Sequence, residues 1–176
     1  MPPKFFPMKL LFSVLFLCFF TMGHAPWGQH NVYRQIHMLI MCSKKDETAF
    51  NHLKTLVSYF NDYLPKSKAR AARAPHEERI LALLETNQIP LALFSYDYLE
   101  KITDDNEKNF NFFSKEVRVI FFFPNMVLIS NKDFPIDKST KIFKSLIKAS
   151  KEKVYKNLKY EERPNFFIPL DDNLKK

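Results

Sequence analysis

The chain has 176 residues, the length of one domain, and 46% of them are hydrophobic, which is enough for a real core. Its net charge is +8, but the basic residues near the C-terminus alternate with acids, as on a solvated helix face, so we expect no nucleic-acid partner. Only two glycines are present, both before residue 29, and this excludes the glycine-rich loops of the common nucleotide-binding classes.

The first 25 residues have the parts of a secretory signal. Lys9 precedes an apolar run from Leu10 to Phe20, and small residues then lead to Ala25 at the spacing of a cleavage site. The run is too short to cross a bilayer as a helix. We therefore expect cleavage near Ala25, a leader at residues 26–34, and a periplasmic or secreted protein with a single domain over residues 35–176.

The first half of this domain alternates between strand-like and helix-like segments. The apolar runs have the length of strands, and the segments between them carry apolar residues at the helical spacing of three and four. This order is typical of an α/β fold with a mainly parallel sheet, here a single three-layer domain. The expected elements are strands within residues 35–43, 67–74 and 89–95 and helices over residues 44–64 and 75–87.

The second half begins with a polar stretch, residues 104–116, that we expect to be a loop with three phenylalanines packing back on the body. Two strands are predicted over residues 117–124 and 125–135, and a long amphipathic helix over residues 136–159. The tail after that helix is expected to be partly extended. A weaker hypothesis is that Lys138 to Lys159 bind an anionic polymer.

No pattern of catalytic or metal-binding residues is present. Cys42 is the one cysteine after the signal, so no intramolecular disulfide is expected, and its apolar neighbours indicate an inert core thiol. No two histidines have the spacing of a zinc site. The acidic pair Asp104 and Asp105 has no apolar shielding to raise a pKa for general acid catalysis. We expect no cofactor, no metal and no enzymatic activity.

Polar side chains follow the predicted strands where each one ends. In an open parallel sheet, ligands bind in the crevice beyond the carboxyl ends of the strands. We therefore predict that Ser95, Tyr96 and Asp97 line a ligand site, with Ser43 and His76 opposite. The alternative stays open that Ser43, Ser95 and Asp97 only cap helices.

The stretch "ERILALLETNQIPLALFSYDYLEKI", Glu78 to Ile102, resembles a segment of the solute receptors of tripartite ATP-independent transporters of the TAXI type. Asn87 replaces the usual glycine and Pro90 the usual acid. The stretches "VRVIFFFPNMVLISNKDFPI" and "FFIPLDDNLKK" are similar to later parts of the same family. The resemblance implies one lobe of a periplasmic-binding-protein fold, with "ARAPHEE" where those receptors have a Gly-Ser turn.

The resemblance implies a non-enzymatic, solute-binding-like protein that binds a small organic acid or amino acid, or acts as an accessory of a membrane transporter subunit. The alternative is a secreted protein–protein interaction module that has lost ligand binding. The replaced glycine turn, the aromatic residues Phe110, Phe112 and Phe113, and the lysine-rich helix favour this second hypothesis.

Overall fold

The computed structural model describes residue 33 and residues 36–104, 106–152, 158–161, 163 and 165–174. The chain divides into two units, Met1–Gln35 and Ile36–Lys176, and the architecture below is that of the second unit. The predicted signal peptide lies outside the described residues, as does the predicted leader except for Tyr33. The elements are β1 (Leu39–Ser43), α3 (Glu47–Tyr63), η1 (Pro65–Ser67), β2 (Arg70–Ala74), α4 (Glu77–Glu85), β3 (Leu91–Ser95), α5 (Tyr96–Asp104), α6 (Glu107–Lys115), β4 (Val117–Phe122), β5 (Met126–Asn131), α7 (Ile136–Ser150) and η3 (Asp172–Leu174).

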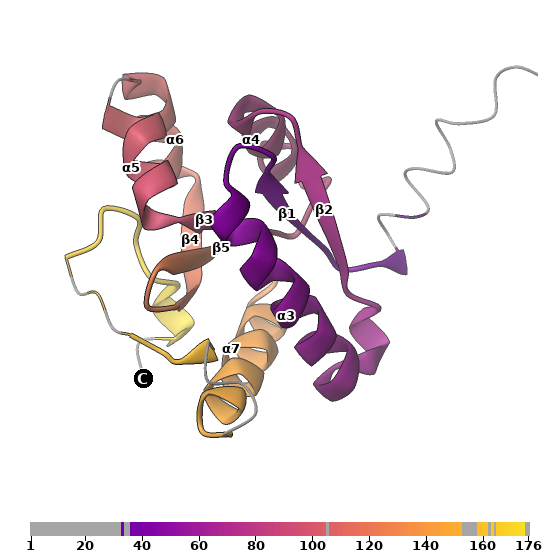
Figure 1. The fold of residues 1–176 in the computed structure, drawn as a ribbon. Coiled ribbons are helices and arrows are strands. Elements are labelled where there is room, and N and C mark those ends of the chain that lie inside the picture. The colour runs from indigo at the N-terminus through magenta and orange to yellow at the C-terminus, as the bar shows by residue number, and fades with distance from the viewer. Residues whose placement is uncertain are drawn as a thin grey trace, which may run out of the picture. The chain divides into compact units, whose positions relative to one another are not determined.

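The five strands form one sheet in the order β2-β1-β3-β5-β4 (Figure 1). β1 pairs in parallel with both β2 and β3, whereas β5 is antiparallel to its neighbours β3 and β4. Four strands therefore point in one direction and β5 in the other. The α/β class predicted from the sequence is confirmed, in a mixed sheet that is mostly parallel.

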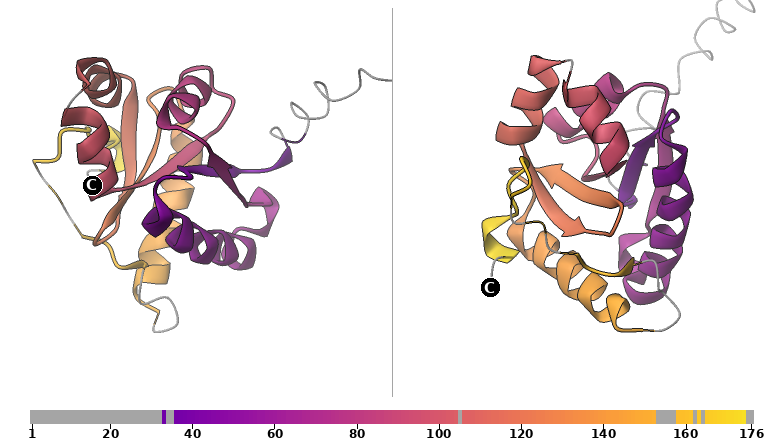
Figure 2. Two further views of the ribbon diagram at one scale, coloured as in Figure 1. Left: turned by 45° about the horizontal axis from the view of Figure 1, so that its top comes forward. Right: turned by 60° about the vertical axis from the view of Figure 1, so that its left-hand side comes forward.

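Helices cover both faces of the sheet, which makes the domain a three-layer structure (Figure 2). One face packs against α4, α5 and α6, and the other against α3 and α7. β1 and β3 are buried on both sides, which explains why their sequences "LIMCS" and "LALFS" are apolar runs rather than alternating patterns.

The two edges of the sheet differ. Beside β4, the C-terminal tail runs parallel to the strand: the Val119 N–H donates to Pro169 O at 2.9 Å, and the Asp171 N–H donates to Val119 O at 3.1 Å. β2 forms the opposite edge, and within the described residues only β1 pairs with it. One edge is therefore covered by the chain itself, and no described strand pairs with the outer side of the other.

Two sequence predictions need correction. Residues 104–116 are not a loop: α6 forms there because the Asn106 side chain caps it by accepting from the Asn109 N–H at 3.1 Å, and Phe113 anchors it in the core. The last helix ends at Ser150, well before residue 159, and residues 153–157 lie outside the described part of the chain. None of the described helices combines the length and apolar character that a membrane span requires.

Candidate functional site

The carboxyl ends of β1, β2 and β3 lie at one edge of the sheet, because these strands are parallel. The helices that follow them, α3, α4 and α5, all begin at this edge, which we call the carboxyl edge (Figure 1). The start of a helix carries a partial positive charge. The fold therefore brings three helix N-termini to one place, as the sequence pattern predicted.

Three side chains at this edge, those of Ser43, Tyr98 and Glu77, form a directed chain of hydrogen bonds, and the side chain of Lys45 forms an ion pair with Glu77. We call these four residues the carboxyl-edge cluster. The Tyr98 hydroxyl donates to Glu77 Oε2 at 2.7 Å and lies 3.0 Å from Ser43 Oγ. Since the one phenolic proton points to Glu77, Ser43 must donate to the Tyr98 oxygen. Ser43 Oγ in turn accepts the Lys45 backbone N–H at 3.1 Å. Each donor in this chain therefore points toward the next residue in the direction of the Glu77 carboxylate.

The cluster becomes more exposed from its base to its rim. Ser43 is fully buried and Tyr98 is nearly so. The Glu77 side chain is 14% exposed, and the Lys45 side chain, whose Nζ lies 3.8 Å from Glu77 Oε2, is 54% exposed. The cluster therefore has a buried hydroxyl base and a charged rim, of which the Lys45 side chain is the exposed part.

The buried carboxylate of Asp46 links two of the elements that carry the cluster's surroundings, α3 and β3. Its Oδ1 accepts the Ala49 N–H at 3.0 Å and so caps α3, while its Oδ2 accepts the Ser95 N–H at 2.8 Å. The cap of α3 is thus Asp46 and not Ser43, which the sequence had offered as a possible cap. By bonding to the end of β3, Asp46 fixes the spacing between β3 and the start of α3.

The pKa values of the cluster favour fixed charges over proton transfer. Burial raises the pKa of Tyr98, and the Glu77 carboxylate raises it further. Burial also acts to raise the pKa of Glu77, but its backbone N–H, the Tyr98 hydroxyl and Lys45 together bring the net pKa below its ordinary value. At neutral pH, Tyr98 is a neutral donor and Glu77 an anion.

The five residues predicted from the sequence have different surroundings. Ser43 and Ser95 are buried and contact opposite ends of Tyr98: Ser43 Oγ lies 3.0 Å from its hydroxyl, and Ser95 Oγ accepts its backbone N–H at 3.4 Å. His76 is exposed at the start of α4, next to Glu77. Asp97 is exposed on the first turn of α5.

Tyr96 faces another part of the chain. Its hydroxyl donates to Phe123 O at 3.0 Å, and the guanidinium of Arg163 lies 3.9 Å above its ring. Phe166 contacts the same ring edge-on, with the ring centroids 5.5 Å apart. Arg163 and Phe166 of the C-terminal tail therefore cover part of the Tyr96 ring. Burial raises the pKa of Tyr96 to about 12, so it too stays neutral.

The sequence interpretation did not assign Lys45, Glu77 and Tyr98 to the predicted site. One signal could have found Tyr98: it lies three residues after Ser95, in the first turn of the helix that follows the strand, so a long side chain there can reach back over the strand end. Within the described residues, no three His, Cys, Asp or Glu side chains form a group that could hold a metal ion. Cys42 is buried in the core, and burial raises the pKa of its thiol to about 12.

The chain matches no protein-family model, no curated protein and no solved structure.

Proposed function

We propose that this chain is an exported, non-enzymatic binding protein that takes a small carboxylate-bearing solute at the carboxyl edge. One observation supports this above all: Lys45 and Glu77 form a partly exposed ion pair at the rim, above a buried base of hydroxyls. A carboxylate with a lowered pKa is a weak base, which suits charge recognition better than general base catalysis. The signal-like residues 8–25 support export.

Within this class, an amino acid fits the rim better than a simple organic acid. A ligand carboxylate can pair with the exposed ammonium group of Lys45. Glu77 would repel a second anion at this place, but it can accept the ammonium group of an amino acid. When a zwitterionic amino acid binds, the Lys45–Glu77 ion pair is replaced by two ion pairs between the protein and the ligand. No charged group is then left unpaired.

The test is a thermal shift screen of the full chain against the twenty amino acids, with lactate, succinate and citrate as acids that lack an ammonium group. A ligand at a hundred times its Kd stabilises the folded state by about 2.7 kcal/mol, which raises the Tm by roughly 5–10 °C. Lys45→Gln should abolish the shift, and Lys144→Gln on the exposed side of α7 should keep it. A cooperative melt that no compound moves would refute the proposal.

A second candidate function is a protein–protein interaction module. The observation that favours it is the C-terminal tail over Tyr96: Arg163 already covers one face of the ring and Phe166 contacts it edge-on, so a small ligand cannot also contact the covered face. The domain would then act as a rigid scaffold for a partner protein, for example a membrane transporter subunit. This function would be favoured if the Lys45→Gln variant still bound a partner protein and if no solute raised the Tm of the wild-type chain.

A further inference from the structure

We propose that the open edge of β2 binds an acidic, extended segment of a partner protein as an added strand. This site is separate from the carboxyl-edge cluster. β2 is the edge strand whose outer side no described strand covers. An uncovered edge offers a row of unpaired backbone N–H and C=O groups, which is the template that strand addition uses.

The pairing of β2 with β1 shows which backbone groups face outward. The Arg70 N–H donates to Met38 O at 3.0 Å, and Ala74 O accepts from the Lys44 N–H at 2.7 Å. In a parallel pair, the residues that bond to the neighbour alternate with those that face away. Ala71 and Arg73 therefore direct their N–H and C=O groups to the open side, and the methyl group of Ala71 leaves room for an approaching chain.

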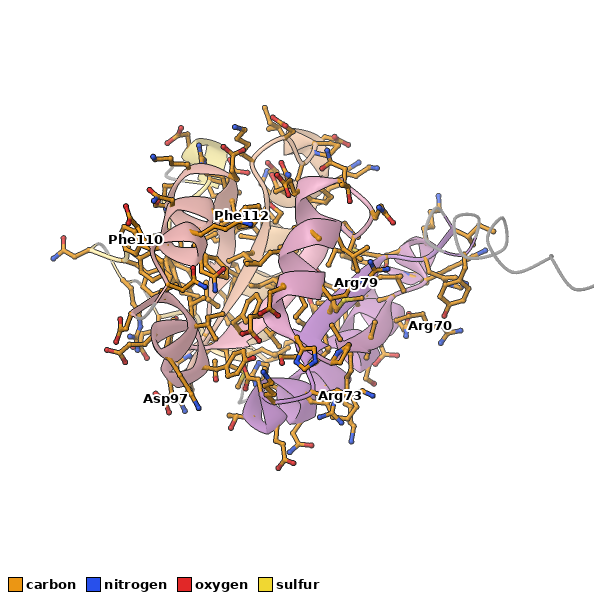
Figure 3. All side chains as sticks on the ribbon, turned by 90° about the horizontal axis from the view of Figure 1, so that it is seen from above. Arg70, Arg73, Arg79, Asp97, Phe110 and Phe112 are labelled. Atoms are coloured by element: carbon orange, nitrogen blue, oxygen red, sulfur yellow. The ribbon has the colours of Figure 1, made fainter. Side chains whose placement is uncertain are left out.

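The positive charge of this edge favours an acidic segment as its occupant. Residues 64–76 carry four lysines and arginines and no acid. The guanidinium groups of Arg70 and Arg79 are exposed and make no hydrogen bond or ion pair with the described residues, whereas Arg73 is held against the Phe50 ring at 4.1 Å. Figure 3 shows Arg70, Arg73 and Arg79 together on the side of the molecule formed by β2 and α4, away from Asp97 and Phe110.

These arginines repel a second copy of β2 and attract an acidic strand. The opposite edge gives an example of the expected mode within the same molecule. There, the extended tail pairs with Val119 of β4 and carries Asp171 next to the pairing residue Leu170. An acidic segment at β2 would repeat this arrangement with a partner's chain, and its carboxylates would pair with the arginines.

The experiment is an NMR titration of the full ¹⁵N-labelled chain with a blocked octapeptide of alternating threonine and glutamate. Shifts should centre on the amides of Ala71 and Arg73, and their hydrogen exchange should slow at least tenfold at saturation. Arg70→Glu should weaken binding about tenfold, whereas Lys144→Glu, the same charge change on exposed α7, should alter it less than about threefold.

Two further probes separate strand addition from attraction by charge alone. The same peptide with proline in place of threonine lacks half of its N–H groups, and it should bind at least tenfold more weakly. A thymidine octanucleotide should not slow exchange at Ala71 and Arg73. Equal binding of the proline peptide or the oligonucleotide, or no shift at millimolar peptide with a folded chain, would overturn the proposal.

Discussion

Replacing Tyr98 by phenylalanine tests whether the carboxyl-edge cluster stabilises the fold. The change removes one hydroxyl and keeps the ring, which stacks on Phe94 with an interplanar angle of 6°. The lost hydroxyl donates to the Glu77 carboxylate at 2.7 Å and accepts from Ser43. A hydrogen bond to a charged group contributes about 1.5–3 kcal/mol, so we expect a loss of about 2 kcal/mol in the free energy of unfolding.

Urea unfolding followed by far-ultraviolet circular dichroism measures this loss, because the single tryptophan lies outside the described domain. With an m-value of about 2 kcal/mol per molar, the midpoint should fall by about 1 M. Tyr63→Phe is the matched control: its hydroxyl also donates to a glutamate, Glu152, but at an exposed site, so we expect a loss below about 0.5 kcal/mol. Equal losses in the two variants would refute the cluster's structural role.

Three further predictions use the same unfolding assay. Asp46→Ala should cost about 3 kcal/mol, since it removes a helix cap and leaves the buried Ser95 N–H unpaired; a loss under 1 kcal/mol would contradict this. Glu77→Gln should destabilise the chain at pH 7, and because the folded pKa of Glu77 is lowered, the difference from wild type should fade as the pH falls below about 4.3. Burial lowers the pKa of His52 to about 4, so the unfolded state binds the proton more tightly and stability should drop by about 2–3 kcal/mol between pH 7 and pH 4.5; His52→Leu should remove most of that drop, and an unchanged drop would exclude His52 as its source.

The fold could be predicted where local pattern and burial agree. The apolar strands β1 and β3 and the amphipathic helix α3 follow from periodicity alone. Helix α6 could not, because its sequence is polar and its stability comes from the Asn106 cap and from Phe113 packed edge-on against Phe94, a contact between residues nineteen positions apart. The antiparallel direction of β5 also depends on a tertiary pairing with β3 that no local pattern specifies.

The position of the candidate site in the fold could be predicted from the sequence, but not the full set of residues that form it. The carboxyl edge follows from the order of strands and helices, and so do Ser43 and Ser95 at the strand ends. The partner of Ser43 is Tyr98, fifty-five residues away, and sequence spacing gives no measure of that distance in space. The cover over Tyr96 comes from Arg163 and the tail, an arrangement that depends on where the last segment crosses the sheet edge.

The cluster divides into a part that should stay fixed on ligand binding and a part that should rearrange. At the base, Asp46 and Tyr98 each join two elements through buried hydrogen bonds, and breaking any of these would leave a buried polar group unpaired. At the rim, the ion pair of Lys45 and Glu77 is partly exposed, and pairs of this kind contribute about 1 kcal/mol or less. A solute can therefore separate the two charges at small cost while the base holds the three helix N-termini in place, so a ligand should alter the surroundings of Lys45 and leave those of Ser43 unchanged.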